Sequence, residues 1–315
     1  MTLRICLLTD ETIETFNPSI YMKDYDWDLV TVEAPLDGFV QSLSAGGKYD
    51  VYFNLFEGFD HDDSSGYRLV ATLEALKLPF TGGHREFYSV TREQMQAAAE
   101  AKGLRFARGF HAGQHSNLEQ ARSLQFPLIV KHPNSFASAG LTRDSRVDSF
   151  EQLREQFQRM CGLYGAARVE EFIDGDEVSC LIVDNPDDLT APFAYLPAQV
   201  SFPSNETFLH EEAKWFNWDV HVVPLEKPEL ASAIQEISKK MYLAMNGTGY
   251  ARVDLRARPS GELVIIEINP NCGILYGPED RSHADLPISW DKDGHRGFLD
   301  RVFRSAILHR KIRAA

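Results

Sequence analysis

YARVDLRARPSGELVIIEINPN, residues 250–271, contains two runs of alternating apolar and polar residues, with Pro, Ser and Gly between them at 259–261. Turn-forming residues between two such runs predict an antiparallel β-hairpin. Side chains alternate between the two faces of a strand, so polar residues two positions apart share one face. The polar pairs are Arg252 and Asp254 in the first run and Glu267 and Asn269 in the second.

A common hairpin register would place these two pairs beside each other, so that two carboxylates, an amide oxygen and a guanidinium converge. Carboxylates this close repel each other unless a cation lies between them. Mg²⁺ bridged to phosphates suits so small a set of oxygen ligands. Arg252 would then pair with a phosphate oxygen beyond the metal. The alternative is a surface hairpin with one solvated face and a salt bridge.

The composition of the chain favours a soluble enzyme. Its 315 residues are 43% hydrophobic, which is enough for a sizeable core and two or three subdomains. A net charge of −14 opposes binding to a nucleic-acid backbone. No apolar run approaches the length of a membrane span, and the N-terminus lacks the features of a signal peptide. We therefore expect a cytoplasmic protein with neither a nucleic-acid nor a membrane partner.

The four cysteines, Cys6, Cys161, Cys180 and Cys272, have neither a CxxC motif nor a zinc-binding spacing. This pattern indicates reduced thiols rather than a disulfide framework. Cys272 follows the predicted hairpin, but no histidine is near it in the sequence, so we interpret it as a packing residue rather than a nucleophile. The ten histidines also lack the HxxxH spacing that is typical of zinc sites.

Local patterns predict the order of the elements. Short β-rich runs at 3–10, 28–34 and 50–58 alternate with a helix-forming segment at 65–78, which predicts an α/β layer with a largely parallel sheet. Further helices are predicted over 89–105, 149–165 and 227–247, and strands over 126–133 and on both sides of the turn at 174–176.

Segments in the same order resemble the D-alanine–D-alanine ligase family of the ATP-grasp superfamily. They are YDVYFNLFEG and GYRLVATLEALKLPFTGG within 49–83, FPLIVKHPNSFASAGL at 126–141, VEEFIDGDEV at 169–178, HEEAKW at 210–215, and ARVDLR and EINPNCG within 251–273. The resemblance implies an α+β ATP-grasp fold. An N-terminal Rossmann-like α/β domain over 1–85 would precede two ATP-grasp subdomains, over 86–178 and 179–315, which sandwich the nucleotide. It also implies a homodimer.

The resemblance assigns contacts with ATP to several residues. Lys131 would meet the α- and β-phosphates as a point charge, and Arg92, where the family has a lysine, would reach the α-phosphate. Ser138 belongs to a loop whose N–H groups would close over phosphates. The adenosine residues would be Glu170 at the adenine amino group, the backbone of Glu171, Phe172 and Ile173 along the adenine edge, and Glu177 at the ribose. A surface lysine, an ordinary loop and a solvated acidic turn are the alternatives.

The resemblance also implies a catalytic centre. Lys214 would approach the γ-phosphate from a loop that closes over the site. Asp254, Glu267 and Asn269 would bind two Mg²⁺ ions, for which Mn²⁺ is an expected substitute. Arg252 would steady the transferred phosphoryl group. The N–H of Gly273 would approach an oxyanion, which a side chain at this position would obstruct.

The implied reaction has two steps. A substrate carboxylate attacks the γ-phosphate of ATP and forms an acyl phosphate, and the amine of a second substrate then displaces phosphate and forms an amide. The protein contributes positioning, charge neutralisation by Mg²⁺ and a dry site.

The segments that would bind the amino acids depart from the family pattern. LLTDETIETFNP at 7–18 replaces a glycine-rich turn and leaves Glu11 or Glu14 as a candidate for an ammonium group. Glu57 stands where the family has a histidine, and Tyr276 lies in the altered loop after the metal strand. Trp215 replaces a tyrosine.

Three interpretations follow. The first is a ligase that joins an amino acid to a small amine or amino acid, with secondary-metabolite assembly as a conjectured role. The second is a D-alanine–D-alanine ligase of cell-wall synthesis with unusual subsites. The third is a nucleotide-binding regulatory protein without catalysis, which would not need the complete set of phosphoryl-transfer residues.

Overall fold

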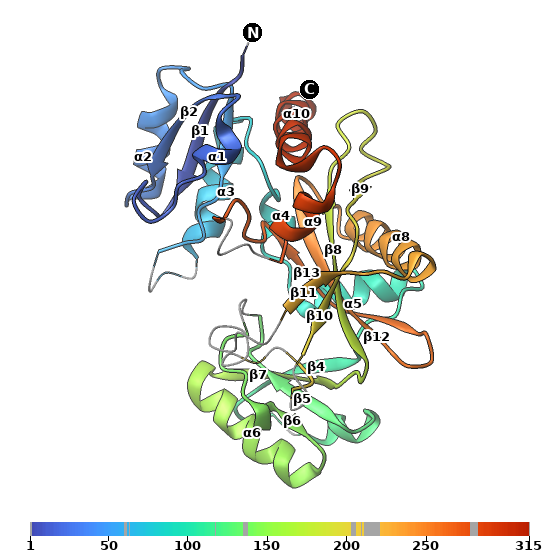
Figure 1. Ribbon diagram of the computed structural model, residues 1–315. Coiled ribbons are helices and arrows are strands. Elements are labelled where there is room, and N and C mark those ends of the chain that lie inside the picture. The colour runs from blue at the N-terminus through green and yellow to red at the C-terminus, as the bar shows by residue number, and fades with distance from the viewer. Residues whose placement is uncertain are drawn as a thin grey trace.

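The computed structural model describes residues 2–59, 62, 64–116, 118–134, 138–202, 206–208, 210, 221–277 and 283–314. Lys214 and Trp215 lie outside these residues. Three β-sheets form the framework, and Figure 1 shows the N-terminal sheet at the upper left and a four-stranded sheet at the bottom. Within the described part of the chain, no helix is both long and apolar enough to cross a membrane.

The first sheet has the strand order β2-β1-β3, and its strands run parallel. It consists of β1 (Arg4–Thr9), β2 (Asp26–Thr31) and β3 (Val51–Asn54), with the helices α1 (Ser19–Met22), α2 (Leu36–Ser44) and α3 (Ser65–Ala75). The predicted parallel α/β layer is confirmed. The C-terminal helix α10 (Gly294–Ala314) packs on this sheet too, because its Phe298 and Phe303 share a core with Ile5 and Phe53.

The second sheet is antiparallel and has the order β4-β7-β5-β6. Its elements are β4 (Gly109–Gly113), η1 (Leu118–Ser123), β5 (Leu128–Lys131), η2 (Arg143–Ser145), β6 (Arg146–Val147), α6 (Phe150–Tyr164) and β7 (Ala166–Glu171). The predicted helix over 149–165 is confirmed. Its start is capped by the Ser149 side chain, which accepts a hydrogen bond from the N–H of Gln152, and it ends at Gly165 with a φ of 75°.

The third sheet has the order β11-β10-β8-β12-β13, and β9 pairs with β8 at its side. Its strands are β8 (Asp176–Val183), β9 (Phe193–Ala194), β10 (Ala198–Ser201), β11 (His221–Pro224), β12 (Tyr250–Ala257) and β13 (Leu263–Pro270). The remaining helices among the described residues are α4 (Arg85–Tyr88), α5 (Arg92–Ala101), α8 (Pro228–Ala244) and α9 (Asp285–Trp290). The capping box that starts α5 at Thr91 and the proline that starts α8 are both as predicted.

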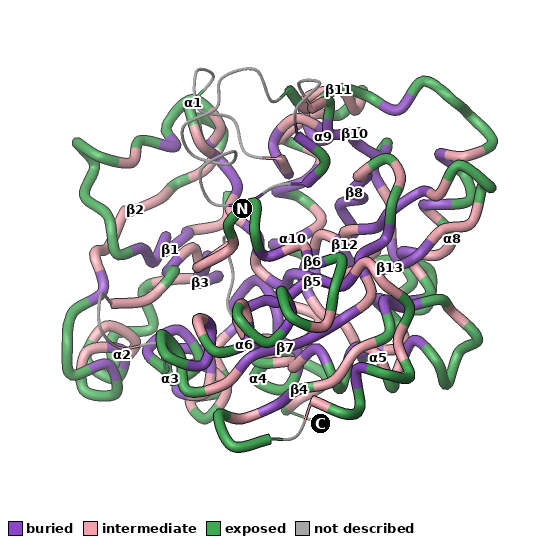
Figure 2. The backbone as a smooth tube through the Cα atoms, turned by 90° about the horizontal axis from the view of Figure 1, so that it is seen from below, coloured by how far each residue is buried: buried purple, intermediate pink, exposed green. Residues whose placement is uncertain are grey.

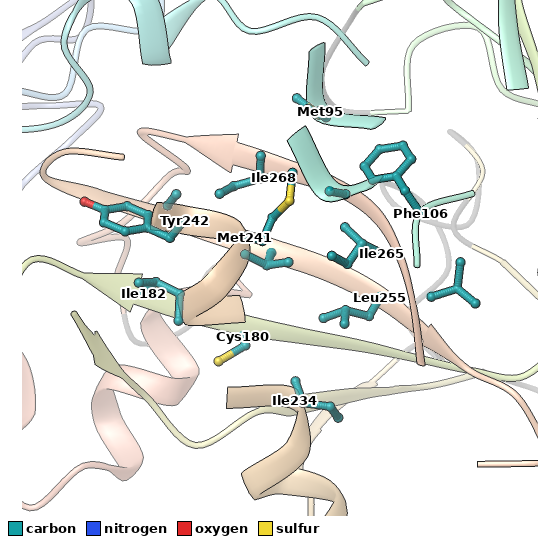
Figure 3. Close-up of a cluster of buried hydrophobic side chains, with 14 of the residues drawn as sticks. Met95, Phe106, Cys180, Ile182, Ile234, Met241, Tyr242, Leu255, Ile265 and Ile268 are labelled. Atoms are coloured by element: carbon teal, nitrogen blue, oxygen red, sulfur yellow. The ribbon is translucent and has the colours of Figure 1, made fainter. Parts of the chain in front are cut away.

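The largest core lies between the third sheet and the helices α5 and α8. Figure 3 shows Met95 of α5, Phe106 just after α5 and Met241 of α8 in this core. They pack with side chains of the sheet, such as Ile182 of β8 and Ile265 of β13. Figure 2 shows that buried residues follow the strands and exposed residues follow the outer loops.

The hairpin predicted over 250–271 is confirmed. β12 and β13 pair antiparallel, with Arg252 opposite Asn269 and Asp254 opposite Glu267. The turn is closed by the N–H of Arg258, which donates to the carbonyl of Glu262 at 2.8 Å. The four polar side chains therefore project from neighbouring positions of one sheet, as the alternation of the sequence indicates.

The turn at 174–176 does connect two strands, but these strands do not pair with each other. β7 belongs to the second sheet and β8 to the third. A Cβ on Gly175 would lie 2.1 Å from the carbonyl oxygen of Ala257, so the chain passes too close to β12 there for any side chain. At this turn the chain passes from the second sheet to the third. The local sequence does not distinguish such a connection from the turn of a hairpin.

The packing crosses the predicted domain boundaries at two places. Met95 and Ala99 of α5 fall within the predicted subdomain 86–178 but belong to the core of the third sheet. Helix α10 falls within the predicted subdomain 179–315 but packs on the first sheet. The division at residues 85 and 178 stays a prediction.

Candidate active site

A cavity of about 1140 Å³ is lined by residues of all three sheets. Thr9 and Asn54 are the last residues of β1 and β3, so the carboxyl ends of the parallel strands open into it. Such an edge is where open α/β sheets bind ligands. Lys131 of β5 enters from the second sheet and Asp254 of β12 from the third.

The cavity brings together most of the residues that the sequence singled out. Its lining includes Glu11, Glu57, Arg92, Lys131, Ser138, Glu170, Glu171, Phe172, Ile173, Glu177, Arg252, Asp254, Glu267, Asn269, Gly273 and Tyr276. Glu14 is the exception among the described residues, because it is exposed in the loop after β1 and does not line the cavity. Lys214 lies outside the described residues. The roles assigned to these side chains stay predictions.

Polar groups of the hairpin contact one another. The guanidinium of Arg252 donates from Nε and Nη2 to the two carboxylate oxygens of Asp254, at 2.7 and 2.8 Å. The amide nitrogen of Asn269 donates to Asp254 at 2.8 Å and to Glu267 at 3.2 Å. An arginine and an amide thus balance the repulsion between the carboxylates.

Glu267 is paired with a buried arginine that comes from α5. The Nη2 atom of Arg92 donates to Oε2 of Glu267 at 2.6 Å, and its Nη1 donates to the carbonyl oxygens of His132 and Pro133 at 3.3 and 3.2 Å. Burial raises the pKa of Glu267, but the charges of Arg92 and Lys131 more than offset this effect and hold the pKa at about 2. Glu267 is therefore ionised at neutral pH.

This donor set fits Mg²⁺. Asp254 and the ionised Glu267 offer hard oxygen ligands, and a half-turn of the Asn269 amide would present its oxygen instead of its nitrogen. Among the described residues, no group of three or more His, Cys, Asp and Glu side chains is placed to hold a metal ion. Mg²⁺ is commonly held by one or two carboxylates together with water and substrate phosphates, so this set does not need further protein carboxylates.

Lys131 is oriented by a buried network. Its ammonium pairs with Oε1 of Glu170, and Arg168 donates from Nε to Oε2 of the same carboxylate at 2.9 Å. Arg168 is fully buried and also contacts Glu93 and Gln96 of α5, each at 2.8 Å. Burial raises the pKa of Glu170, but Lys131 and Arg168 lower it below its ordinary value. Both oxygens of Glu170 are thus engaged by cations.

Another part of the cavity lining is aromatic and contains the partly buried carboxylate of Glu177. Arg256 donates to Glu177 at 2.7 Å and lies 5.5 Å from the centre of the Phe172 ring, and Phe208 packs edge-on against Phe172 at 5.6 Å. Burial raises the pKa of Glu177 more than Arg256 lowers it. A flat apolar ring near a carboxylate acceptor is an environment that suits a nucleotide base and its sugar.

Arg168 and Arg256 were missed by the sequence reasoning. Arg256 continues the alternation of Arg252 and Asp254 along β12, so this pattern could have predicted that Arg256 lies on the same face of the strand. Arg168 carries no local signal, because an arginine in the strand 166–171 is expected at the surface rather than in the core.

The end of the cavity nearest the first sheet contains Glu57 and Tyr276. The hydroxyl of Tyr276 donates to Oε1 of Glu57 at 3.0 Å. Burial and the Glu57 carboxylate raise the pKa of Tyr276, so its hydroxyl stays protonated and remains a donor. A Cβ on Gly273 would lie 2.9 Å from the Tyr276 ring, so the absence of a side chain there makes room for this ring.

Cys272 lies next to this end but is not poised for nucleophilic chemistry. The side chain is buried, and burial raises the pKa of its thiol to about 12. Since the thiolate is the nucleophilic form, this environment agrees with the interpretation of Cys272 as a packing residue. All four cysteines are buried and free.

The family model described as D-ala D-ala ligase C-terminus matches residues 97–294. The chain belongs to the D-alanine–D-alanine ligase family. Enzymes of this family are ATP-dependent ligases that form a carbon–nitrogen bond and use ATP and Mg²⁺ as cofactors, and this chain is a ligase of that class.

Relatives of the D-alanine–D-alanine ligase family match different shares of the chain. The D-alanine–D-alanine ligase of Lactococcus lactis (strain IL1403) is 27% identical over 256 residues, which are 78% of this chain and 68% of that protein. The vancomycin B-type resistance protein VanB of Enterococcus faecalis is 31% identical over 154 residues, 48% of this chain and 43% of VanB. The match with VanB thus covers less than half of either chain.

Solved structures of the family share the fold. The D-alanine–D-alanine ligase from Bacillus anthracis complexed with ATP has a TM-score of 0.73 at 16% identity, and the match covers 99% of both chains. The VanG D-Ala:D-Ser ligase from Enterococcus faecalis has a TM-score of 0.67 at 14% identity over 100% of both chains. The predicted ATP-grasp fold is thereby confirmed.

Proposed function

We propose that this chain activates the carboxylate of a small amino acid with ATP and joins it to an amine through an acyl phosphate. The observation that carries the proposal is the convergence of Lys131, Arg252, Asp254, Glu267 and Asn269 in one cavity. A cation for phosphates, an arginine and a set of hard oxygen ligands are the parts that phosphoryl transfer requires. A protein that only binds a nucleotide has no need for all of them.

Each residue would contribute positioning or charge. Lys131, held by Glu170, would present its ammonium to the phosphates of ATP. Asp254, Glu267 and Asn269 would hold Mg²⁺, which neutralises charge on the phosphates when it is bound. Arg252, already aligned by Asp254, would face the oxygens of the transferred phosphoryl group.

The chemistry balances without a covalent enzyme intermediate. A carboxylate oxygen of the first substrate bonds to the γ-phosphorus as the bond to ADP breaks, and the product is an acyl phosphate. The amine nitrogen of the second substrate then bonds to the acyl carbon, inorganic phosphate leaves, and the amine loses a proton. Water competes with the amine for the acyl phosphate, so enclosure of the cavity favours ligation over hydrolysis.

D-alanine is the first substrate to test. The relatives are named for D-alanine–D-alanine and D-Ala:D-Ser ligation, so they favour the synthesis of D-alanyl-D-alanine over a role in secondary-metabolite assembly. Glu57 and Tyr276 depart from the family pattern in the region that would bind the amino acids. Other amines should therefore be tested as substrates alongside D-alanine. We also propose that the protein is a homodimer and acts in the cytoplasm.

Phosphate release from ATP and Mg²⁺ tests the function. D-alanine, other amino acids and small amines are offered singly and in pairs, and each active mixture is analysed by mass spectrometry. The expected result is release that requires D-alanine, with a product lighter than its two substrates by one water. Phosphate release at the same rate with and without any of these substrates, or phosphate release without a condensed product, would contradict ligation.

A further inference from the structure

The loop after β13, residues 271–277, is held by a buried carboxylate that the reaction described above does not use. Asp285, the first residue of α9, is fully buried. It accepts a hydrogen bond from the N–H of Leu275 at 2.7 Å and another from the N–H of Tyr276 at 3.1 Å. Nε2 of His295 on α10 lies 3.2 Å from the oxygen that Leu275 contacts. The buried carboxylate of Asp285 thus connects α9 to the loop 271–277 and to α10.

The backbone of the loop depends on this carboxylate. Leu275 has a φ of +66°, a conformation that a bulky side chain rarely adopts, and its side chain is buried. Such a conformation persists only where the surroundings impose it. Successive N–H groups in a turn of this kind point together towards one anion, and here Asp285 is that anion.

The same contacts fix Tyr276 at the cavity. Its N–H is held by Asp285, its carbonyl oxygen accepts a hydrogen bond from the hydroxyl of Tyr21 at 2.8 Å, and its own hydroxyl donates to Glu57 at 3.0 Å. The ring of Tyr21 stacks on His295 with 4.1 Å between the ring centres. Tyr276 and Glu57 line the cavity, whereas Asp285 and Tyr21 hold the loop from behind.

These contacts involve residues other than those that the proposed function assigns to ATP. Glu57 follows β3 of the first sheet, and Tyr276 lies beyond the end of the hairpin. The phosphate and metal residues, such as Lys131 and Asp254, come from the second and third sheets. A displacement of Tyr276 should therefore affect a substrate other than the nucleotide.

We propose that Asp285 is a positioning residue for the amino-acid end of the cavity. By holding the N–H groups of Leu275 and Tyr276 it fixes the Tyr276 hydroxyl against Glu57, and this pair shapes the subsite of a non-nucleotide substrate. The proposal rests on the ligase function proposed above. Asp285 acts through Tyr276 and does not touch the reacting atoms.

The test compares Asp285→Asn, Tyr276→Phe and the double variant, using the best substrate pair of the panel. Asparagine keeps the shape of the side chain but replaces one acceptor oxygen with a donor. We expect Asp285→Asn to raise the KM of one non-nucleotide substrate about tenfold, comparable to the loss of one outer contact that orients a site. The KM of ATP should change less than about twofold. Tyr276→Phe should add little in the Asp285→Asn background.

Tyr21→Phe tests the loop from its other side without altering a buried charge. We expect a smaller rise in the KM of the same substrate. Tyr25→Phe is its matched control, because it also removes a hydroxyl near α1 but from a ring that packs edge-on against Phe303 of α10. Equal rises in the KM of ATP and the other substrate, or fully additive effects of Asp285→Asn and Tyr276→Phe, would overturn the proposal.

Hydrogen exchange separates this proposal from the proposed function. A wild-type protein that turns over no pair in the panel would contradict the ligase reaction but not the role of Asp285 in the loop. In that case the amides of Leu275 and Tyr276 should still exchange at least tenfold faster in Asp285→Asn than in the wild type. Unchanged exchange at both amides would overturn the positioning role.

Discussion

Glu267 shows how single residues of the site are prepared for a metal ion. Its carboxylate is largely buried and would be costly to ionise there, yet Arg92 and Lys131 hold it ionised. The alternation of the sequence predicted that Glu267 faces Asp254. It did not predict Arg92 as the partner, because the contact joins residues 175 positions apart.

The variant Glu267→Gln should retain the fold but lose most of its activity. The change removes one negative charge from the set of ligands for Mg²⁺ and replaces the carboxylate that Arg92 contacts with a neutral amide. We expect kcat to fall at least about 100-fold, as measured by phosphate release at saturating ATP. Glu33→Gln removes an exposed carboxylate outside the cavity and should leave kcat unchanged. Wild-type turnover by Glu267→Gln would rule out the metal assignment.

Cys272 should be dispensable for chemistry. Its thiol is buried and its pKa is raised to about 12, so very little thiolate is present near pH 8. We expect Cys272→Ser to keep kcat within about threefold of the wild type, because the change affects packing only. An iodoacetamide-treated native protein should show no modified Cys272 by mass spectrometry. Loss of turnover in the serine variant at unchanged thermal stability would restore the nucleophile hypothesis.

Asp28 makes the stability of the first sheet depend on pH. Hydrogen bonds from Lys48 and Tyr49 lower the pKa of Asp28 from 3.8 to about 2. A lowered pKa contributes stability that is present above the unfolded pKa and is lost as the pH falls through 2. Asp28→Asn should therefore be less stable than the wild type at pH 6, and the difference should vanish near pH 2.

The size of this effect is limited by exposure. The side chain of Asp28 is 37% exposed, so solvent screens its contacts and the difference at pH 6 should stay below about 1 kcal/mol. Urea unfolding at both pH values measures it. A variant that is equally stable at pH 6, or less stable only at pH 2, would contradict the sign.

At the scale of elements, a buried carboxylate joins the end of β8 to two helices. Asp184 accepts hydrogen bonds from the hydroxyl of Tyr242 on α8 and from the N–H of Gly249, each at 2.7 Å, and contacts Nε2 of His309 on α10 at 2.7 Å. Helix α10 is thereby tied to the third sheet as well as to the first.

Removal of this connection should destabilise the protein without touching the cavity. Asp184→Ala leaves the hydroxyl of Tyr242 and the N–H of Gly249 buried without an acceptor, so we expect a loss of about 3 kcal/mol in the free energy of unfolding. Tyr242→Phe removes only one bond and should cost about 1 kcal/mol. Urea unfolding measures both. Equal losses in the two variants would show that Asp184 does not connect the elements as described.

The elements also show what local sequence can predict. The helix starting at Thr91 and the hairpin over 250–271 were predicted because a capping box and a turn with alternation are local signals. The separation of β7 and β8 into different sheets was not predicted, because the turn at 174–176 has the same residues in either arrangement. The partners of a strand depend on contacts distant in sequence.

For the whole molecule, the cavity joins three sheets, so its ligand should stabilise all of them together. Ligand at 100 times its Kd stabilises a folded protein by about 2.7 kcal/mol. We expect ATP with Mg²⁺ to raise the Tm by several degrees in a thermal-shift measurement. Lys131→Ala should lose most of this rise, whereas Lys102→Ala, outside the cavity lining, should keep it. An equal rise in both variants would remove Lys131 from the phosphate site.

The packing of the sheets and helices against one another was harder to predict from the sequence than the single elements were. The resemblance to the D-alanine–D-alanine ligase family gave the ATP-grasp fold and most of the cavity-lining residues. It did not give the position of α10 on the first sheet, or the burial of Arg168 opposite Lys131 on the neighbouring strand, because both result from packing between distant segments. Such contacts become visible only when the three sheets are placed together.

Transfer of oxygen from substrate to phosphate tests the central claim most directly. D-alanine labelled with ¹⁸O in its carboxylate is incubated with the enzyme, ATP, Mg²⁺ and the amine substrate, and the released phosphate is analysed by mass spectrometry. An acyl phosphate route predicts one ¹⁸O atom in each phosphate, because the carboxylate oxygen that attacks the γ-phosphorus leaves with it. Unlabelled phosphate alongside a condensed product would contradict the acyl phosphate, and unlabelled phosphate without such a product would mean that water, not a carboxylate, attacks ATP.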